Sequence, residues 1–158
     1  MEYKEPKGLN SVAKFHETFN LPILDTPQIP SAERCMLRIN LLQEELNELK
    51  EAIEQNDLIE VADAFCDIQY VLSGAILEFG LAEKFKTLFD EVQRSNMSKT
   101  CKSMDEAKAT QVHYDAKDQP SEIKQSNDEY LVYRKEDGKV LKSVNYSAAN
   151  LVQYLESE

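Results

Sequence analysis

The stretch "NLLQEELNELKEAIEQNDLIEVADAFCDIQYVLSGA" (residues 40–75) decides the fold, because it holds two helical patterns separated by one short connection. Acidic residues occur throughout both patterns, and they are Glu44, Glu45, Glu48, Glu51, Glu60, Asp63 and Asp67. Acidic side chains are common on the solvated face of a helix, but they are unusual within its apolar stripe. The position of each acid around the helix axis therefore decides whether these residues form a site.

On the first of the two helices, three acids project toward the expected core. At about 100° per residue, Glu48 lies about 40° and Glu45 about 100° from Glu44. Leucine residues and Arg34 share this sector, whereas polar residues such as Asn47 occupy the opposite side. Glu44, Glu45 and Glu48 therefore interrupt an inward-facing sector.

The second helix carries a matching acidic stripe. Glu60, Asp63 and Asp67 fall within about 60° of one another, at the border of the apolar sector. Tyr70 continues this line by one turn. The connection "EQND" between the helices is short, which favours antiparallel packing. The two acidic stripes are therefore expected to face each other across the seam between the helices.

Carboxylates gathered in a partly dry seam need a compensating charge. Two like charges about 4 Å apart repel each other by roughly 4 kcal/mol at an effective dielectric constant of about 20. Such groups must be protonated, paired with a base or bound to a metal ion. Mg²⁺ favours sites built from a few carboxylates, water and substrate phosphate, and Mn²⁺ is the alternative ion. A solvated acidic flank on a helical bundle remains the competing interpretation.

The rest of the chain predicts a mainly α protein with a four-helix core and a small C-terminal α+β tail. Helices are expected at about residues 9–19, 31–55, 57–79 and 81–95, with Ser31 and Asp57 as N-caps and Gly80 ending the third. Residues 1–100 form the expected functional domain, and residues 101–158 form an extension. In the extension, a short helix at 104–110 and a polar linker at 111–128 precede a β-hairpin at 130–144, which turns at Asp137-Gly138. A last short helix is expected to begin with Ser147 as its cap.

The composition argues against several functional classes. The chain of 158 residues has 29 acidic residues against 18 basic ones and a formal net charge of -11, so its surface repels nucleic acid and anionic membranes. Cys35, Cys66 and Cys101 fit no metal-binding spacing, and reduced thiols are expected. The charged N-terminus "MEYKEPKGLN" is not expected to be a signal peptide, and no apolar run approaches the roughly 20 residues of a membrane span. We therefore expect a cytoplasmic protein.

"EELNE" followed by "DAFCD" resembles the signature of the all-α nucleoside triphosphate pyrophosphatases, which pairs E-E-x-x-E on one helix with E-x-x-D on the next. This superfamily includes the MazG proteins, the dimeric dUTPases and phosphoribosyl-ATP pyrophosphohydrolase. The resemblance extends over residues 9–100 and includes "VQRSNMSK", which is similar to a segment of the MazG-like branch. One position departs from the signature, because Ala64 stands where the motif has Glu. Asp63 is the nearest substitute, with Glu60 in reserve.

The resemblance implies a four-helix MazG-like core and Mg²⁺-dependent hydrolysis of a nucleoside triphosphate to the monophosphate and pyrophosphate. In this interpretation Glu44, Glu48 and Asp67 hold the metal ion, and Asp63 assists. Glu45 shares the metal or acts as the general base that orients the attacking water. The expected substrate-binding residues are Asn96 and Lys99, which match the family's substrate contacts, together with Tyr70 beside the base and Arg34.

Two alternatives for the function stay open. A house-cleaning enzyme for non-standard or deoxynucleotides is favoured over phosphoribosyl-ATP pyrophosphohydrolase, because the SNMSK segment is similar to the MazG-like branch. A non-catalytic helical interaction module that retains the fold is the alternative from a different class. The oligomers of the superfamily and the apolar faces of the third and fourth helices also predict a homodimer or homotetramer.

Overall fold

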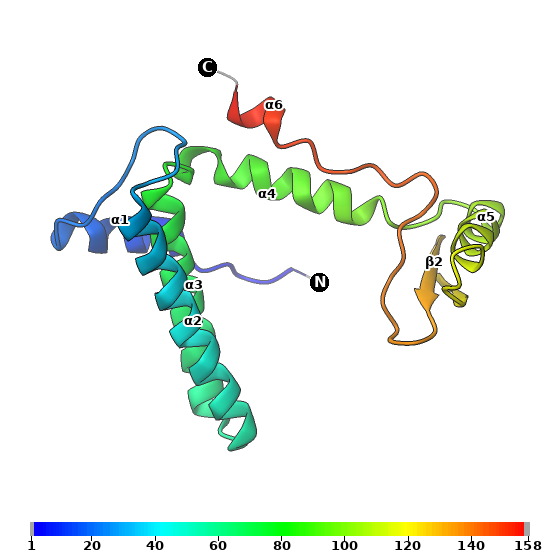
Figure 1. The fold of residues 1–158 in the computed structure, drawn as a ribbon, viewed down its shortest axis with the longest axis horizontal. Helices are drawn as coiled ribbons and strands as arrows, with labels where there is room; N and C mark the ends of the chain where they lie inside the picture. The colour runs from blue at the N-terminus through cyan, green and yellow to red at the C-terminus, as the bar shows by residue number, and fades with distance from the viewer. Residues whose placement is uncertain (1, 157–158) are drawn as a thin grey trace. The chain divides into compact units, whose positions relative to one another are not determined.

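The computed structural model describes residues 2–156 and is mainly helical (Figure 1). Its elements follow in the order α1 (Gly8–Thr18), α2 (Ala32–Glu54), α3 (Leu58–Glu78), α4 (Ala82–Met97), α5 (Met104–Asp115), β1 (Ser121–Ser126), β2 (Glu129–Arg134) and α6 (Val152–Leu155). The two strands form an antiparallel hairpin. The predicted fold class, a helical core with a small tail that contains a β-hairpin, is therefore confirmed.

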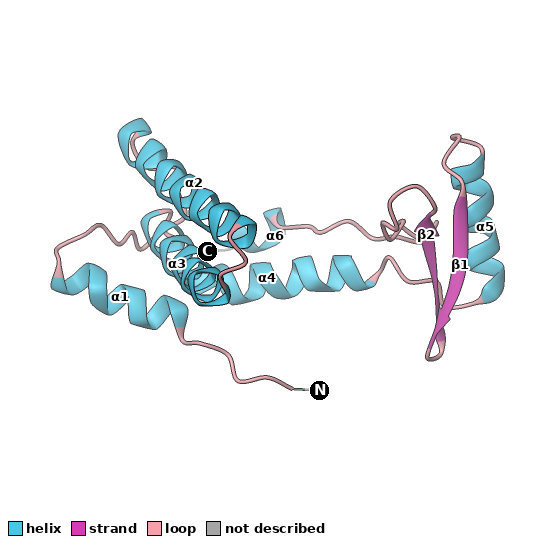
Figure 2. Ribbon diagram, turned by 90° about the horizontal axis from the view of Figure 1, so that it is seen from below, coloured by secondary structure: helices cyan, strands magenta, loops and turns pink. Residues whose placement is uncertain are grey.

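The chain divides into two compact units, the first ending at Phe85 and the second beginning at Lys86. In the first unit, α2 and α3 lie side by side in both views, and α1 packs against α3 (Figures 1 and 2). The short connection between α2 and α3 makes the two helices antiparallel, as the sequence predicts. The division between the units falls inside α4, so this helix belongs to both.

Side-chain caps fix where α2 and α3 begin. The hydroxyl of Ser31 accepts a hydrogen bond from the backbone N–H of Arg34 (3.4 Å). The carboxylate of Asp57 accepts from the N–H groups of Ile59 (3.0 Å) and Glu60 (3.2 Å). Both predicted N-caps are confirmed, and each satisfies a backbone donor that has no partner within its own helix.

Gly80 follows the end of α3 in a conformation that suits glycine. Its φ is +66°, and a Cβ atom at this position would lie 2.0 Å from the carbonyl oxygen of Thr26. The approaching connection between α1 and α2 is also hydrogen-bonded to the helix end, from the N–H of Gln28 to the carbonyl of Phe79 (3.1 Å). Gly80 therefore ends the helix as predicted and lets this connection close over it.

In the second unit, α5 lies along one face of the hairpin (Figure 2). Ile123 of β1 pairs with Val132 of β2. A buried cluster joins the helix to the strands and consists of Cys101, Ala107, Val132 and Leu141, with Tyr114, Ile123 and Tyr130 packed against it. This cluster gives the second unit a core of its own.

The position of the hairpin differs from the prediction. The strands span 121–134 and turn at Asn127, whose φ is +53°. The predicted linker at 111–128 is therefore wrong, because it contains the end of α5 and the whole of β1. The predicted turn at Asp137-Gly138 does form, with a hydrogen bond from the N–H of Gly138 to the carbonyl of Arg134 (2.9 Å), but it leads only to an isolated bridge between Tyr133 and Val140.

The C-terminal part of the second unit is extended before α6. Residues 143–150, which we call the strap, run beside α4 (Figure 1). Ser147 lies in this strap and does not cap α6, whose N-cap is Leu151. Within residues 2–156, no single helix is long and apolar enough to cross a membrane, and α3 and α4 meet that requirement only when they are joined as a bent pair.

Candidate functional site

The predicted metal ligands come from the facing helices α2 and α3. Glu45 and Asp67 are half-buried, whereas Glu44, Glu48 and Asp63 are exposed. One carboxylate oxygen of Glu45, Oε2, is buried and has no hydrogen-bond partner among the described residues. A buried polar atom without a partner is unfavourable, so this oxygen is the acceptor in the seam that a ligand would stabilise most.

The charges of the five acids act on one another. Burial raises the pKa of the Glu45 carboxyl, and the negative charges of Asp67, Glu48, Glu44 and Asp63 raise it further. Like charges favour the protonated form of a neighbouring acid. The other four predicted ligands therefore all act on the pKa of Glu45.

The carboxylates are suitable ligands for a divalent cation, but their side chains do not converge on one point. Within the part of the chain that the structure describes, no three His, Cys, Asp or Glu side chains are placed so that they could hold an ion. Oxygen donors are nevertheless the ligands that Mg²⁺ prefers, and the unpartnered Oε2 of Glu45 is such a donor. Rotation of the exposed side chains of Glu44, Glu48 and Asp63 is then required to complete a coordination shell.

A second charged group, which sequence reasoning missed, is centred on Glu78 at the end of α3. Glu78 is fully buried and forms ion pairs with Arg34 and Arg38. The Nε of Arg34 donates to Glu78 Oε2 (3.1 Å), and an Nη of Arg38 lies 3.1 Å from the Nε2 of His16. The Nδ1 of His16 lies 2.9 Å from the carbonyl oxygen of Pro22. This network ties α1, α2 and α3 together.

The balance of burial and hydrogen bonding sets the state of Glu78. Burial alone would raise the pKa of this carboxyl, but the hydrogen bonds from Arg34 and Arg38 outweigh burial and hold the pKa below its usual value. Glu78 is therefore ionised at neutral pH. The sequence did contain a signal for it, because an acid within the apolar run "VLSGAILEFG" is as unusual as the acids of the seam.

A cavity of about 260 Å³ adjoins this network. Its walls are formed by Val12, Phe15, His16, Leu21, Arg34, Leu37, Arg38, Leu41, Tyr70 and Val71. The rings of Phe15 and Tyr70 meet edge to face, with their centroids 5.6 Å apart. The structure thus places two predicted substrate contacts, Arg34 and Tyr70, on the wall of one cavity, and Tyr70 follows Asp67 by one turn of α3.

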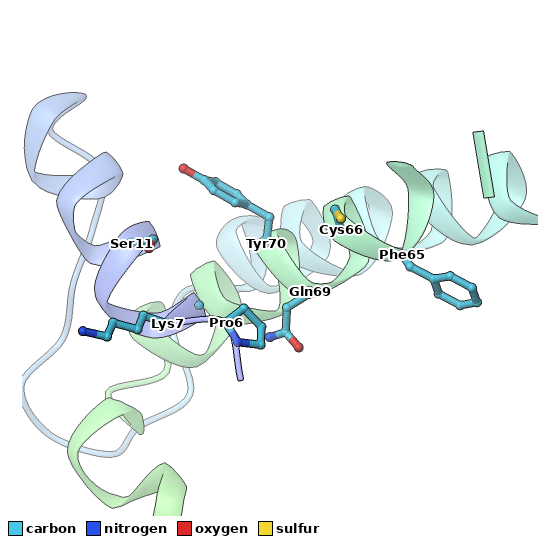
Figure 3. A pocket seen from close by; sticks show the side chains of 8 residues that line it. Pro6, Lys7, Ser11, Phe65, Cys66, Gln69 and Tyr70 are labelled. Atoms are coloured by element: carbon cyan, nitrogen blue, oxygen red, sulfur yellow. The ribbon is translucent and has the colours of Figure 1, made fainter. Parts of the chain in front are cut away.

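Tyr70 also borders a larger cavity of about 410 Å³. It is lined by Pro6, Lys7, Gly8, Ser11, Phe65, Cys66, Gln69 and Tyr70 and contains no acidic residue (Figure 3). The thiol-bearing residue Cys66 is exposed, whereas Cys35 is half-buried and Cys101 is buried. This cavity therefore lacks the carboxylates that would bind a metal ion. Lys7 is the one basic residue among those that line it, so it also lacks a cluster of cations for phosphate.

The remaining predicted substrate contacts, Asn96 and Lys99, lie in the second unit. The Nζ of Lys99 donates a hydrogen bond to the Oδ1 of Asn96 (2.8 Å). The two side chains therefore lie together at the end of α4, with the amide N–H groups of Asn96 and further N–H groups of Lys99 able to donate to a ligand.

The chain can be compared with known proteins. A family model described as phosphoribosyl-ATP pyrophosphohydrolase matches residues 12–96. The uncharacterized protein L479 of Acanthamoeba polyphaga mimivirus is 30% identical over 93 residues, which make up 56% of this chain and 37% of that protein. The matched part is thus little more than a third of the relative's length. The family match includes all of α2 and α3, and it ends before Lys99 and the strap.

Proposed function

Because the chain belongs to the phosphoribosyl-ATP pyrophosphohydrolase family, which indicates a pyrophosphohydrolase acting on nucleotide-like substrates, we propose that it hydrolyses nucleoside triphosphates to monophosphates and pyrophosphate with Mg²⁺. Members of this family typically depend on a divalent metal ion. The observation that carries the proposal is the buried, unpartnered oxygen of Glu45, which lies within the influence of four other acids.

The five acids divide into two roles in this proposal. Glu44, Glu48, Asp63 and Asp67 hold Mg²⁺, or Mn²⁺ in its place, and the buried Oε2 of Glu45 shares the ion. The bound ion supplies positive charge that offsets the charge of the triphosphate. Glu45 accepts the proton of the attacking water, because its raised pKa brings the carboxylate closer to the range of an effective general base.

The nucleobase enters the 260 Å³ cavity in this proposal. Phe15 and Tyr70 offer aromatic surface for a base, and pockets for small ligands combine such apolar walls with a few polar groups. Two N–H groups of Arg34 bind Glu78, and a guanidinium has five donors. Arg34 therefore retains donors for the substrate while Glu78 fixes its orientation.

A nucleoside triphosphate of the nucleotide pool is the proposed substrate, and phosphoribosyl-ATP is the second candidate because the matching family carries its name. Asn96 and Lys99, whose side chains are hydrogen-bonded to each other, are proposed to contact phosphate or sugar. Nucleic acid and membrane are not proposed as partners, since the net charge of -11 repels polyanions. Free thiols also suit the proposed cytoplasmic location.

The test is pyrophosphate release from all common NTPs and dNTPs and from phosphoribosyl-ATP, each with and without Mg²⁺. We expect release that requires the metal and is fastest for one nucleoside triphosphate. Asp67→Asn should remove this activity, and Glu54→Gln, which changes an exposed acid at the end of α2, should not. Fastest release from phosphoribosyl-ATP would favour the second candidate, and no release from any substrate would favour a non-catalytic module.

The first unit is proposed to function as a homodimer. Among the described residues of α2, Ala52 is the buried apolar side chain. Large apolar side chains are exposed instead, at intervals of seven residues along each helix: Ile39, Leu46 and Ile53 on α2, and Leu58, Phe65 and Leu72 on α3. Intervals of seven are typical of helices that pack against further helices. A second copy supplies such a pair and completes a four-helix bundle, or a tetramer by further pairing.

A further inference from the structure

The strap is fixed to the last two turns of α4 by backbone hydrogen bonds. The N–H of Asn150 donates to Glu91 Oε1 (2.8 Å), and the N–H of Ser147 donates to Ser98 Oγ (3.0 Å). Arg94 in turn donates to a carbonyl of the strap (3.1 Å). These contacts hold the strap against the C-terminal end of α4 and the turn that follows it.

Tyr146 joins the strap to the end of α4. Its hydroxyl lies 3.0 Å from the hydroxyl of Ser95, which is buried. Lys99 lies in the turn that follows α4, and its ammonium donates to the side chain of Asn96, the residue after Ser95. The ammonium of Lys142 lies over the Tyr146 ring, 4.3 Å from its centroid. Tyr146 thus contacts Lys142 through its ring and Ser95, the neighbour of Asn96, through its hydroxyl.

The electrostatics agree with this placement. The hydrogen bond with Ser95 lowers the pKa of Tyr146, burial opposes this change, and the positive charges of Lys142 and Lys99 lower the pKa further. A charge can act on the hydroxyl in this way only from nearby. This agrees with the contacts that place the ammonium of Lys142 over the Tyr146 ring and that of Lys99 against Asn96.

The acids next to the strap already have other partners. Glu91 pairs with Arg94, which together with the N–H of Asn150 lowers the pKa of Glu91 to about 2. Glu106 accepts hydrogen bonds from the N–H of Lys102 and from the hydroxyl of Ser143. Neither Lys99 nor Lys142 takes part in an ion pair among residues 2–156. Two adjacent cations without counter-ions are unexpected in a chain with a net charge of -11.

We infer that Lys142 is a substrate-binding residue: with Lys99 and Asn96 it forms a subsite for a polyphosphate chain, and Tyr146 is the positioning residue that holds its ammonium in place. Phosphate oxygens are good acceptors for ammonium and amide donors, and such charge-assisted hydrogen bonds are the stronger ones. The assignment of the ligand as the phosphates of a nucleotide rests on the proposed function. Lys99, Lys142 and Tyr146 lie outside the part of the chain that matches the family, whereas Asn96 is its last residue.

The test is titration calorimetry with inorganic tripolyphosphate in the absence of metal, using the full-length protein. Lys142→Ala should weaken binding by about tenfold, which corresponds to about 1.4 kcal/mol, because a hydrogen bond to a charged group is lost. Lys142→Arg should retain most of the affinity. Lys108→Ala is the matched control, because it removes the same charge from an exposed position on α5. Unchanged thermal unfolding of Lys142→Ala would exclude a structural cause for the loss.

Tyr146 is tested in the same titration. Tyr146→Phe keeps the ring beneath Lys142 and should bind tripolyphosphate nearly as well as the wild type, whereas Tyr146→Leu should approach Lys142→Ala. With a nucleotide that is turned over, Lys142→Ala should raise KM with little change in kcat.

Two results would overturn the subsite: equal affinities of Lys142→Ala and Lys108→Ala, or no binding of tripolyphosphate by the wild type. Neither depends on turnover, so a chain that binds tripolyphosphate through Lys142 but releases no pyrophosphate from any nucleotide would contradict the proposed function alone.

Discussion

At the scale of single residues, Glu45 combines a buried oxygen with four neighbouring negative charges. Glu45→Gln removes one of these charges and keeps the shape of the side chain. We expect the metal-free variant to melt at a higher temperature than the wild type, because the repulsion is relieved, and its turnover to fall by a factor of about 10² or more. Differential scanning calorimetry and pyrophosphate release measure the two effects.

Glu54→Gln is the control for this variant, since it changes an exposed acid that pairs only with Lys50 on its own helix. It should alter neither the melting temperature nor the turnover by much. A metal-free Glu45→Gln protein that melts below the wild type would contradict the proposed repulsion between the acids of α2 and α3.

Glu78 has the opposite character, because its ionised form is stabilised by Arg34 and Arg38. Glu78→Gln should lower the free energy of unfolding at neutral pH by about 3 kcal/mol, since it leaves Arg38 buried without its counter-charge. The native pKa is lower than the unfolded value near 4.5, so the ion pair stabilises the fold above that pH. This stabilisation is lost as the pH falls through the native pKa.

Urea unfolding between pH 7 and pH 3 checks this prediction. The difference between the wild type and Glu78→Gln should shrink as the solution is acidified below about pH 4.5. The control is Glu51→Gln, an exposed acid on α2, which should give a small difference at every pH. A gap between the wild type and Glu78→Gln that is as large at pH 3 as at pH 7 would remove the ion pair as its cause.

The residues of the site were predictable to the extent that they repeat at helical spacing. Glu44, Glu45, Glu48, Asp63 and Asp67 could be placed because each lies on a long helix of known phase. Glu78 was not, although it belongs to the same helix as Asp67. Its partners Arg34 and Arg38 come from another element, α2, and helical spacing gives no information about contacts between elements.

At the scale of elements, the packing of α1 and α2 on α3 depends on the absence of a side chain at Gly74. A Cβ atom there would lie 2.7 Å from Arg38 Nη1 and 3.0 Å from His16 Nε2. Replacing glycine by alanine inside a helix normally gains about 1 kcal/mol. Gly74→Ala should destabilise the protein instead, because Arg38 can move only by leaving its partner Glu78. Chemical denaturation gives the sign.

A double variant tests the reason for this loss. In a protein that already carries Arg38→Met, the long charged group is absent and the added methyl meets less resistance. Gly74→Ala should therefore cost less in that background than in the wild type, and the difference measures the coupling of the two residues. Equal costs in both backgrounds would show that Arg38 is not the obstacle.

Elements of the first unit were predictable because their patterns are long and their caps are local. Ser31 and Asp57 act within their own first turns, and Gly80 acts at one helix end. The strand β1 was missed because "SEIKQS" has a single large apolar residue, Ile123. Its pairing is stabilised by Val132 and by the cluster against α5, and such contacts between elements have no signature within the strand itself.

At the scale of the whole molecule, the apolar side chains exposed at intervals of seven lead to a prediction about association. Phe65 is 58% exposed on α3. Phe65→Asp places a charge in the proposed contact between copies and should shift the protein toward a single chain or unfold it. Multi-angle light scattering of the wild type should give at least twice the mass of one chain.

Val112→Asp is the control, because Val112 is 67% exposed on α5 in the second unit. It should leave the measured mass unchanged. A wild type that is monomeric at micromolar concentration, with intact helical circular dichroism, would contradict the homodimer.

The graded accessibility of the three thiols separates the two units experimentally. Cys66 is exposed in the first unit, and Cys101 is completely buried in the second. An alkylating reagent therefore modifies Cys66 in the folded protein, whereas it reaches Cys101 only after the cluster around α5 has opened. Brief labelling pulses along a denaturation series, read out by mass spectrometry, therefore follow the unfolding of the second unit through the labelled fraction of Cys101. No added fluorophore is needed.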